Sequence, residues 1–259
     1  MKSIFQPSTM NEQEIERIIP SEQREVANFL RQKIFSQIPK SHFFLVGGTA
    51  VALKYGHRQS IDFDFFSFPK QLVGHNGEVL NNYDQEILGQ IDRILRQENR
   101  YQRKDMLPEY GQLQYSFDEV GVTFLAFQNM LAQTETDIYQ IPQFPLETWT
   151  NSLGFETLSI KDIAGLKAFA RTRRSKMKDI IDIAEILHHE ISLPQILDIA
   201  ESQFGYDISK KEILTTLLEL DDILANPMDE EIQYIHHRNT DYYIDFIKTK
   251  MVELYNGNS

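Results

Sequence analysis

The sequence contains no cysteine, and the other features that it lacks narrow the possible classes of protein further. Without cysteine there are no disulfides, no thiolate zinc ligands and no thiol nucleophile, which fits a reducing compartment. No apolar run approaches the roughly 20 residues that span a bilayer, and the N-terminal residues lack the apolar segment of a signal peptide. We therefore expect a soluble, cytoplasmic protein of bacterial type with no membrane partner.

The chain is also short of basic residues, with 26 Lys and Arg against 38 Asp and Glu and a formal net charge of −12. This balance argues against a protein that coats nucleic acid or anionic membrane by bulk charge. The deficit is confined to the last third, because residues 1–178 contain 21 basic and 21 acidic side chains whereas residues 179–259 contain 5 and 17. Directly before that acidic third, residues 161–178 hold seven basic residues and one acidic residue.

Hydrophobic periodicity predicts that the first part of the chain mixes helices and strands. The expected helices are 21–37, 50–55 and 83–98, and the expected strands are 43–46, 61–66, 111–117, 121–127 and 155–158. A turn at 118–121 joins two of these strands into a hairpin. The rest of the proline-rich stretch 138–160 is expected to be irregular.

From residue 160 onward the pattern predicts only helices. Their expected ranges are 161–171, 177–189, 193–203, 209–224 and 229–254. An α/β half followed by an all-helical half predicts two domains, with bounds 1–158 and 159–259.

The stretch 43–66 combines features that are typical of a phosphate site. A short apolar strand runs into Gly47 and Gly48, and Thr49 is placed to cap the helix that follows. Glycines let backbone N–H groups approach a ligand closely, and a helix N-terminus favours anions. A phosphate chain is the natural occupant, and the alternative is an ordinary Gly-Gly turn.

Two carboxylates follow on the strand expected at 61–66. Alternation places Asp62 and Asp64 on one face of that strand and directs Phe63 and Phe65 to the core. Two neighbouring carboxylates are costly unless cations or water compensate them, and Mg²⁺ takes oxygen ligands and bridges carboxylates to phosphates. The pattern predicts a metal site, unless the face is simply solvated.

Together these residues resemble the signature of polymerase-β-type nucleotidyltransferases, which here consists of Gly47, Gly48, Thr49, Arg58, Ser60, Asp62 and Asp64. The whole stretch is similar to the AbiEii-type nucleotidyltransferase toxin family. A second stretch, Asp162–Ala168 followed by Arg173–Asp182, resembles the helical motif of that family. The resemblance covers about residues 20–190.

The resemblance implies a fold and an activity. The implied fold is α+β, a polymerase-β-like nucleotidyltransferase core with a small mixed sheet over 1–158, followed by a C-terminal helical bundle over 159–259. The implied reaction is Mg²⁺-dependent (or Mn²⁺-dependent) transfer of a nucleotidyl group from an NTP to an acceptor hydroxyl, for which tRNA is a candidate. The implied role is the toxin of a toxin–antitoxin or phage-defence pair, with an antitoxin protein as partner.

The resemblance also implies roles for individual residues. Asp62, Asp64 and Lys167 would be catalytic, with the two aspartates binding the metal and Lys167 meeting the triphosphate. The implied nucleotide-binding residues are Gly47, Gly48, Thr49, Arg58, Ser60, Lys178, Asp179 and Asp182. Asp179 and Asp182 would complete the pocket or orient Lys167, and the alternative is that they pair with Lys176 or Lys178.

Spacing on the second stretch agrees in part with these implied roles. Lys167, Arg171, Arg174 and Lys178 follow steps of 4, 3 and 4 and would share one helix face if the helix is continuous. Like charges stacked in this way repel one another and are tolerated more easily beside an anion such as an RNA backbone. The alternative is a solvated basic face that pairs with the acidic helices after it.

One expected group is missing, because members of the wider superfamily carry a third carboxylate on a later strand. The matching strand, 121–127, has no acidic residue, and Thr123, Phe124 or Leu125 stands where that acid is expected. Three readings stay open: two carboxylates with another base, recruitment of Asp179 or Asp182, or binding without transfer. The competing functions are therefore a non-catalytic nucleotide- or partner-binding protein of the same fold and an interaction protein that uses its acidic helices.

Overall fold

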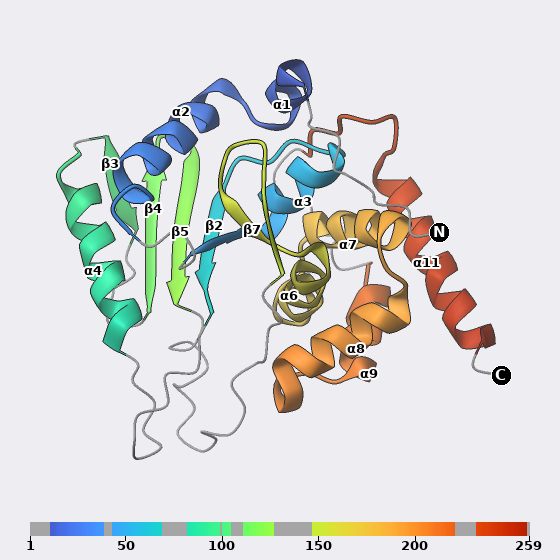
Figure 1. The fold of residues 1–259 in the computed structure, drawn as a ribbon. Coiled ribbons are helices and arrows are strands. Elements are labelled where there is room, and N and C mark those ends of the chain that lie inside the picture. Colours follow the sequence, from blue (N-terminus) through green and yellow to red (C-terminus); the bar gives the residue numbers. More distant parts are fainter. Residues whose placement is uncertain are drawn as a thin grey trace, which may run out of the picture.

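The computed structural model describes residues 11–38, 43–68, 82–98, 100–104, 111–126, 147–220 and 232–257. A seven-stranded mixed sheet with the order β3-β4-β5-β2-β1-β7-β6 forms one side of the molecule, and a group of helices forms the other (Figure 1). The expected class, α+β with a small mixed sheet followed by helices, is therefore confirmed.

The strands are β1 (Phe44–Val46), β2 (Phe63–Ser67), β3 (Tyr101–Lys104), β4 (Gln112–Phe117), β5 (Val120–Ala126), β6 (Thr148–Thr150) and β7 (Glu156–Leu158). β2 runs parallel to β5, and β1 runs parallel to β7. The hairpin between β4 and β5 is confirmed, with a turn of two residues, Asp118 and Glu119. Two strands were not predicted, β3 and β6. The pairing of β6 with β7 corrects the expectation of irregular chain after residue 147.

The helices of the first half are α1 (Glu12–Ile18), α2 (Ser21–Phe29), α3 (Gly47–Tyr55) and α4 (Asn82–Arg96). The helix predicted at 21–37 does not stay α-helical, because a π-helical segment, Leu30–Ile34, follows α2. Leu30 and Ile34 of that segment are buried, and the Phe35 ring lies 4.8 Å from the Phe65 ring of the sheet. The π-helical segment and Phe35 thus pack against the sheet at the place where the α-helix ends.

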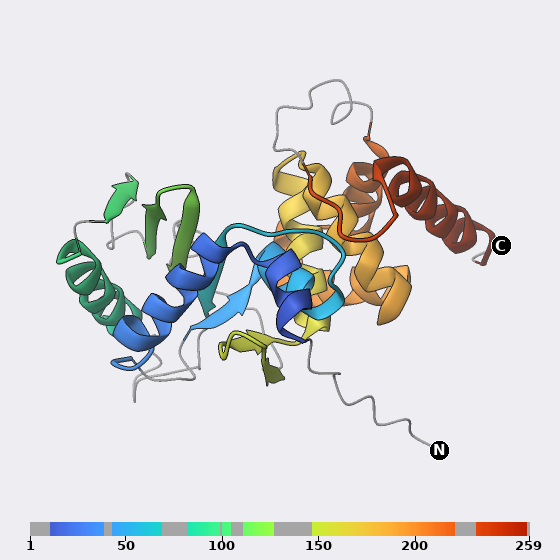
Figure 2. The same cartoon turned by 90° about the horizontal axis from the view of Figure 1, so that it is seen from above.

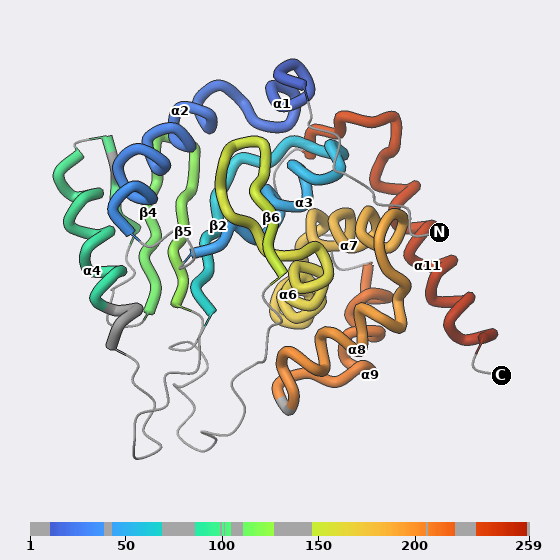
Figure 3. Tube along the Cα trace, viewed as in Figure 1, coloured from blue at the N-terminus to red at the C-terminus, as the bar shows by residue number. Residues whose placement is uncertain are grey.

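The helices of the second half are α6 (Ile160–Arg173), α7 (Met177–His189), α8 (Leu193–Phe204), α9 (Lys210–Leu218) and α11 (Thr240–Gly257). Viewed from above or as a tube, α6 to α9 gather beside the sheet and α11 lies at the outer edge (Figures 2 and 3). The helix predicted at 229–254 was wrong at its start, because residues 232–239 are not helical. Instead, backbone groups of Gln233 and Ile235 pair with the loop after α3. The expected end of the helix at 209–224 falls partly outside the described residues.

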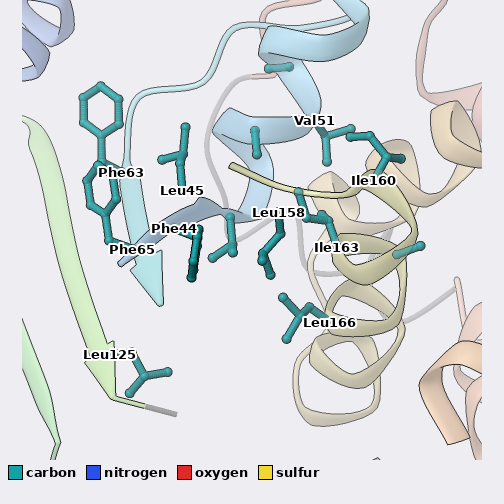
Figure 4. Close-up of a cluster of buried hydrophobic side chains, with 14 of the residues drawn as sticks. Phe44, Leu45, Val51, Phe63, Phe65, Leu125, Leu158, Ile160, Ile163 and Leu166 are labelled. Atoms are coloured by element: carbon teal, nitrogen blue, oxygen red, sulfur yellow. The ribbon is translucent and has the colours of Figure 1, made fainter. Parts of the chain in front are cut away.

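Alternation along β2 separates a core face from an open face. Phe63 and Phe65 are buried, as predicted (Figure 4). The Phe65 ring lies 5.3 Å from that of Phe124 on β5. The π-helical segment and α4 cover this core face. The opposite face carries Asp64 and Thr123 and is turned toward α6. The division at 158 stays a prediction, and buried residues of both halves belong to one hydrophobic cluster.

Among the described residues, no helix combines the length and the apolar composition that crossing a membrane requires.

The aromatic packing between β2 and β5 leads to a prediction about stability. Replacing Phe65 by alanine leaves a cavity in a fully buried aromatic cluster, and we expect a loss of about 3–5 kcal/mol in the free energy of unfolding. The matched control is Tyr255→Ala, whose side chain on α11 is 78% exposed, with an expected change within about 0.5 kcal/mol. Urea unfolding measures both, and equal costs would contradict the packing described.

Candidate functional site

A cleft of about 670 Å³ lies between the open face of the sheet and α6 with the linker that follows it. Ten predicted site residues line this cleft: Gly47, Gly48, Thr49, Arg58, Ser60, Asp62, Asp64, Lys167, Lys178 and Asp179. The eleventh, Asp182, is fully buried, with Oδ2 2.7 Å from the Lys167 ammonium. The two stretches found in the sequence therefore meet at one place.

The N-terminus of α3 forms one end of the cleft. The helix begins at Gly47 rather than at Ala50, so the prediction that Thr49 caps it was wrong. Thr49 is buried within the first turn, where its hydroxyl hydrogen-bonds with the Ser60 hydroxyl at 2.8 Å and donates to the Asp62 carbonyl. Thr49 and Ser60 thus hold the backbone that precedes β2 against α3.

Position 48 requires a glycine because the Arg58 side chain packs directly against its Cα atom. A Cβ atom at this position would collide with the Arg58 guanidinium, so a larger residue would displace Arg58 from Asp182. The exposed N–H groups of a first helical turn attract anions, and this turn opens into the cleft.

The two carboxylates occupy the middle of the cleft, and each lies against a glycine. A Cβ atom at Gly47 would lie 2.6 Å from Asp64 Oδ2, and one at Gly121 would lie 2.7 Å from Asp62 Oδ1. The Gly121 N–H also donates to Asp62 Oδ1 at 3.0 Å. Gly121 was not predicted as a site residue, because in the sequence it is indistinguishable from a turn glycine and its partner is 59 residues away.

The environment of Asp64 disfavours its charged form. Burial raises the pKa of this carboxyl, and the charge of Asp62 raises it further, against the opposing influence of Lys167 and Arg174. Two carboxylates whose charges are not balanced by nearby cations are a suitable place for a cation from solution.

Thr123 takes the place of the missing third acid, because it pairs in register with Asp64 on the neighbouring strand. In the described part of the chain, no cluster of three or more His, Cys, Asp or Glu side chains is arranged to hold a metal ion. Recruitment of Asp179 or Asp182 conflicts with the geometry, since all four of their carboxylate oxygens already contact cationic or histidine side chains. The arrangement favours a site with two carboxylates.

Lys167 lies at the centre of a buried ion network at the helical wall of the cleft. Its ammonium is 2.8 Å from Asp179 Oδ1 and 2.7 Å from Asp182 Oδ2. Arg58 reaches the other side of Asp182 with two donors, Nε and Nη2, at 2.9 and 2.8 Å. Asp179 and Asp182 therefore orient Lys167, and neither Lys176 nor Lys178 supplies these contacts.

The pKa shifts in the network follow from these contacts. Burial alone would raise the pKa of Asp182, but Arg58, Lys167 and the hydrogen bond with His57 together hold it well below its usual range. Burial alone would lower the pKa of Lys167, yet Asp179 and Asp182 raise it overall. Both groups are therefore charged at neutral pH. His57 is buried on Asp182 rather than exposed or lining the cleft, and burial lowers its pKa.

The predicted basic stripe is interrupted, because α6 ends at Arg173 and the chain is not helical again until Met177. Arg171 is buried and donates to the Arg174 and Glu219 carbonyls, so it holds the linker rather than facing the cleft. Arg174 bonds to Asp179 through Nε at 2.8 Å. Arg174 and Lys178 line the cleft. The four basic residues do not share one helix face, because the continuous helix that this required is broken between Arg173 and Met177.

Residues 232–239, here called the strap, pair with the loop after α3 that carries His57 and Arg58, and this contact was not predicted. The Ile235 N–H donates to the His57 carbonyl, the Gln59 N–H donates to the Gln233 carbonyl, and Arg58 forms a β-bridge with Tyr234 (Figure 1).

Glu185 on α7 connects the strap and α11 to the same region. Its Oε1 accepts hydrogen bonds from the Tyr243 hydroxyl at 2.6 Å and from Arg238 at 2.7 Å. Burial alone would raise the pKa of Glu185, but these hydrogen bonds and the nearby His57 lower it overall. The acidic last third of the chain therefore helps to hold the loop that carries Arg58.

The ion network leads to a prediction about stability. Asp182→Asn leaves Lys167 and Arg58 buried with one counter-charge fewer, and we expect a loss of about 3–5 kcal/mol in unfolding free energy. The control is Asp198→Asn, whose carboxylate is 67% exposed and pairs with the exposed Lys210, with an expected change below about 1 kcal/mol.

The pH dependence of the Asp182 contribution is also fixed by its pKa. Since the folded pKa is depressed, the unfolded chain takes up the proton first, and stability falls as pH falls below the ordinary carboxyl value of about 3.9. Urea unfolding of the wild type as a function of pH measures this dependence.

Urea unfolding at pH 7 measures the losses in Asp182→Asn and Asp198→Asn. Equal losses in these two variants would show that the network does not stabilise the fold.

The contact of α11 with Glu185 leads to a third prediction. Tyr243→Phe keeps the buried ring but removes the hydroxyl, so we expect a loss of about 1.5–3 kcal/mol for a hydrogen bond to a charged group. Hydrogen exchange at the amides of Gln59 and Ile235 should accelerate with it. Tyr242→Phe, whose residue is 38% exposed, is the control and should change neither quantity. Unchanged hydrogen exchange at these two amides in Tyr243→Phe would show that α11 does not stabilise the strap.

Similar proteins of known structure share low sequence identity with this chain. JHP933 from Helicobacter pylori is 17% identical, with a TM-score of 0.46 over 96% of this chain and 97% of that one. MenT4, a nucleotidyltransferase toxin from Mycobacterium tuberculosis, is 11% identical, with a TM-score of 0.46 over 90% of this chain and 81% of that one.

An uncharacterized protein of Aquifex aeolicus (strain VF5) is 28% identical over 236 residues, which is 88% of this chain and 99% of that protein. A family model described as nucleotidyl transferase AbiEii toxin, type IV toxin–antitoxin system, matches residues 28–243. This match includes every residue of the cleft and the network described above, and it confirms the resemblance and the enzyme class that the two motifs indicated. The chain belongs to the AbiEii nucleotidyltransferase toxin family.

Proposed function

We propose that this member of the family uses a divalent cation, Mg²⁺ or Mn²⁺, to transfer a nucleotidyl group from an NTP to an acceptor hydroxyl, with an RNA such as tRNA as the acceptor. The observation that carries the proposal is the position of Asp62 and Asp64. They line the same cleft as Lys167 and the N-terminus of α3, which suits phosphates. We place the protein in the cytoplasm, with an antitoxin protein as partner.

The residues of the cleft fit a hard divalent cation. Asp62 and Asp64 offer carboxylate oxygens, and burial together with the charge of Asp62 raises the pKa of Asp64, so a nearby cation would favour its charged form. Held by these two carboxylates, such an ion would supply charge stabilisation at the transferred phosphoryl group.

The other residues bind and orient the substrate. The N–H groups of the first turn of α3 hold the phosphates, and Lys167, fixed by Asp179 and Asp182, offsets the charge of the leaving pyrophosphate. The acceptor oxygen forms a bond to the α-phosphorus as the bond from that phosphorus to the pyrophosphate oxygen breaks. The proton of the acceptor hydroxyl passes to a carboxylate of the Asp62–Asp64 pair.

Thr123 favours a second candidate, a protein that binds nucleotides or a partner but does not transfer. Where other enzymes of this type have a third carboxylate to activate the acceptor, a threonine stands beside Asp64. The same assay decides between the two functions.

The assay incubates the protein with each labelled NTP, Mg²⁺ and total RNA. We expect label transfer by the wild type and a loss of about 10²–10⁴-fold in Asp64→Asn and in Lys167→Met. Asp118→Asn, which changes an acid in the exposed hairpin turn, is the matched control and should transfer normally. Transfer that survives Asp64→Asn would contradict the proposed site, and NTP binding without transfer by the wild type would support the second candidate.

A further inference from the structure

The part of the cleft beyond the two carboxylates has a distinct composition. Three strands present side chains there in two rows that run across the sheet. Asp64, Thr123 and Gln114 stand in register in one row, and Phe66, Leu125 and Gln112 stand in register in the next. All of these residues line the cleft. We call the five members other than Asp64 the ledge.

The cleft is therefore divided by charge. Its helical wall carries Lys167, Arg174 and Lys178, and its middle carries the two aspartates. The ledge has no ionised side chain: it offers two amides, a hydroxyl, an aromatic ring and a leucine. Phosphates belong at the cationic wall, so the neutral ledge is suited to an uncharged part of a ligand.

The ledge lies at a suitable distance for one particular part of a nucleotide. Neighbouring strands are about 4.8 Å apart, so Gln114 stands about 10 Å from Asp64 across β5. This span leaves room for a sugar between a phosphate at Asp64 and a group at Gln114. The amides of Gln112 and Gln114 are partly exposed, and each has two donors and an acceptor, as the reading of a base edge requires.

The ledge also offers apolar side chains against which a nucleobase can pack. Phe66 is partly exposed to the cleft and stands in register with Leu125. An aromatic ring beside polar amides is the combination on which bases stack. Neither glutamine was singled out in the sequence, because they reach the carboxylates only through the register of β4 with β5 and of β5 with β2.

We propose that the ledge is a nucleobase-reading site in which Gln112 and Gln114 determine base specificity. The inference rests on the proposed function and deepens it. The base has two possible sources, the NTP and the terminal nucleotide of the acceptor. Lys104 lies at the outer end of the row beside Gln114, where it would meet a backbone phosphate of an acceptor.

The test compares Gln112→Met, Gln114→Met and the double variant with the wild type. Methionine keeps the length of the side chain and removes its hydrogen-bonding groups. Gln102→Met makes the same change on the exposed part of β3, outside the cleft lining, and serves as the control. Thermal melting first checks that the four variants fold like the wild type.

One arm measures the affinity of each protein for four NTPs and for inorganic tripolyphosphate, which has no base. The other arm measures the affinity for oligoribonucleotides that end in each base or in an abasic sugar. We expect the wild type to prefer the ligand with a base by about tenfold in one arm, and the double variant to lose that preference. A preference in the first arm identifies the NTP as the source, and a preference in the second identifies the acceptor.

Equal binding with and without the base by the wild type in both arms, or an unchanged preference in the double variant, would overturn the inference. Both arms measure binding and need no turnover. Failure of the proposed function appears instead as transfer that survives Asp64→Asn. The two failures are therefore distinguishable.

Discussion

The buried contact of Lys167 with Asp179 and Asp182 is the constraint on which the rest of the site depends. Charges taken out of water are tolerated only when their partners hold good geometry, so α6 and α7 must meet where the ammonium satisfies both carboxylates. Asp182 imposes the same requirement on Arg58, and Arg58 in turn packs against Gly48 at the start of α3. One network thereby fixes the cationic wall of the cleft and the position of the N-terminus of α3.

The buried carboxylates of the ion network and the Asp64 carboxylate in the cleft have pKa values shifted in opposite directions. Asp179 and Asp182 have every oxygen engaged by protein groups, and their pKa values are lowered. Asp64 has its pKa raised, next to Asp62 and an open cleft. The first pair stabilises the fold, whereas the surroundings of Asp64 disfavour its charged form. Sites that sacrifice stability in this way are typically functional.

The sequence was sufficient for the elements that local periodicity specifies and for the residues that family motifs mark. Strands around 44–46 and 63–67, helix α7 and the β4–β5 hairpin were predicted, as was the meeting of the two motifs. Contacts between distant segments were not predictable. Gly121 and Gln114 reach the aspartates through the pairing of β5 with β2, and the strap reaches Arg58 by a β-bridge from Tyr234. Nothing in their local sequence records these long-range pairings. The break after Arg173 was missed because Arg171 holds the linker through the Glu219 carbonyl, 48 residues away.

We propose that the cleft binds a divalent cation on Asp62 and Asp64, with nucleotide phosphates at α3 and Lys167. A crystal structure with Mn²⁺ and a non-hydrolysable NTP analogue is the decisive measurement. We expect an anomalous peak within bonding distance of both carboxylates and phosphate density at the N–H groups of Gly47 and Gly48. A cation bound elsewhere, or phosphates that avoid the first turn of α3, would contradict it.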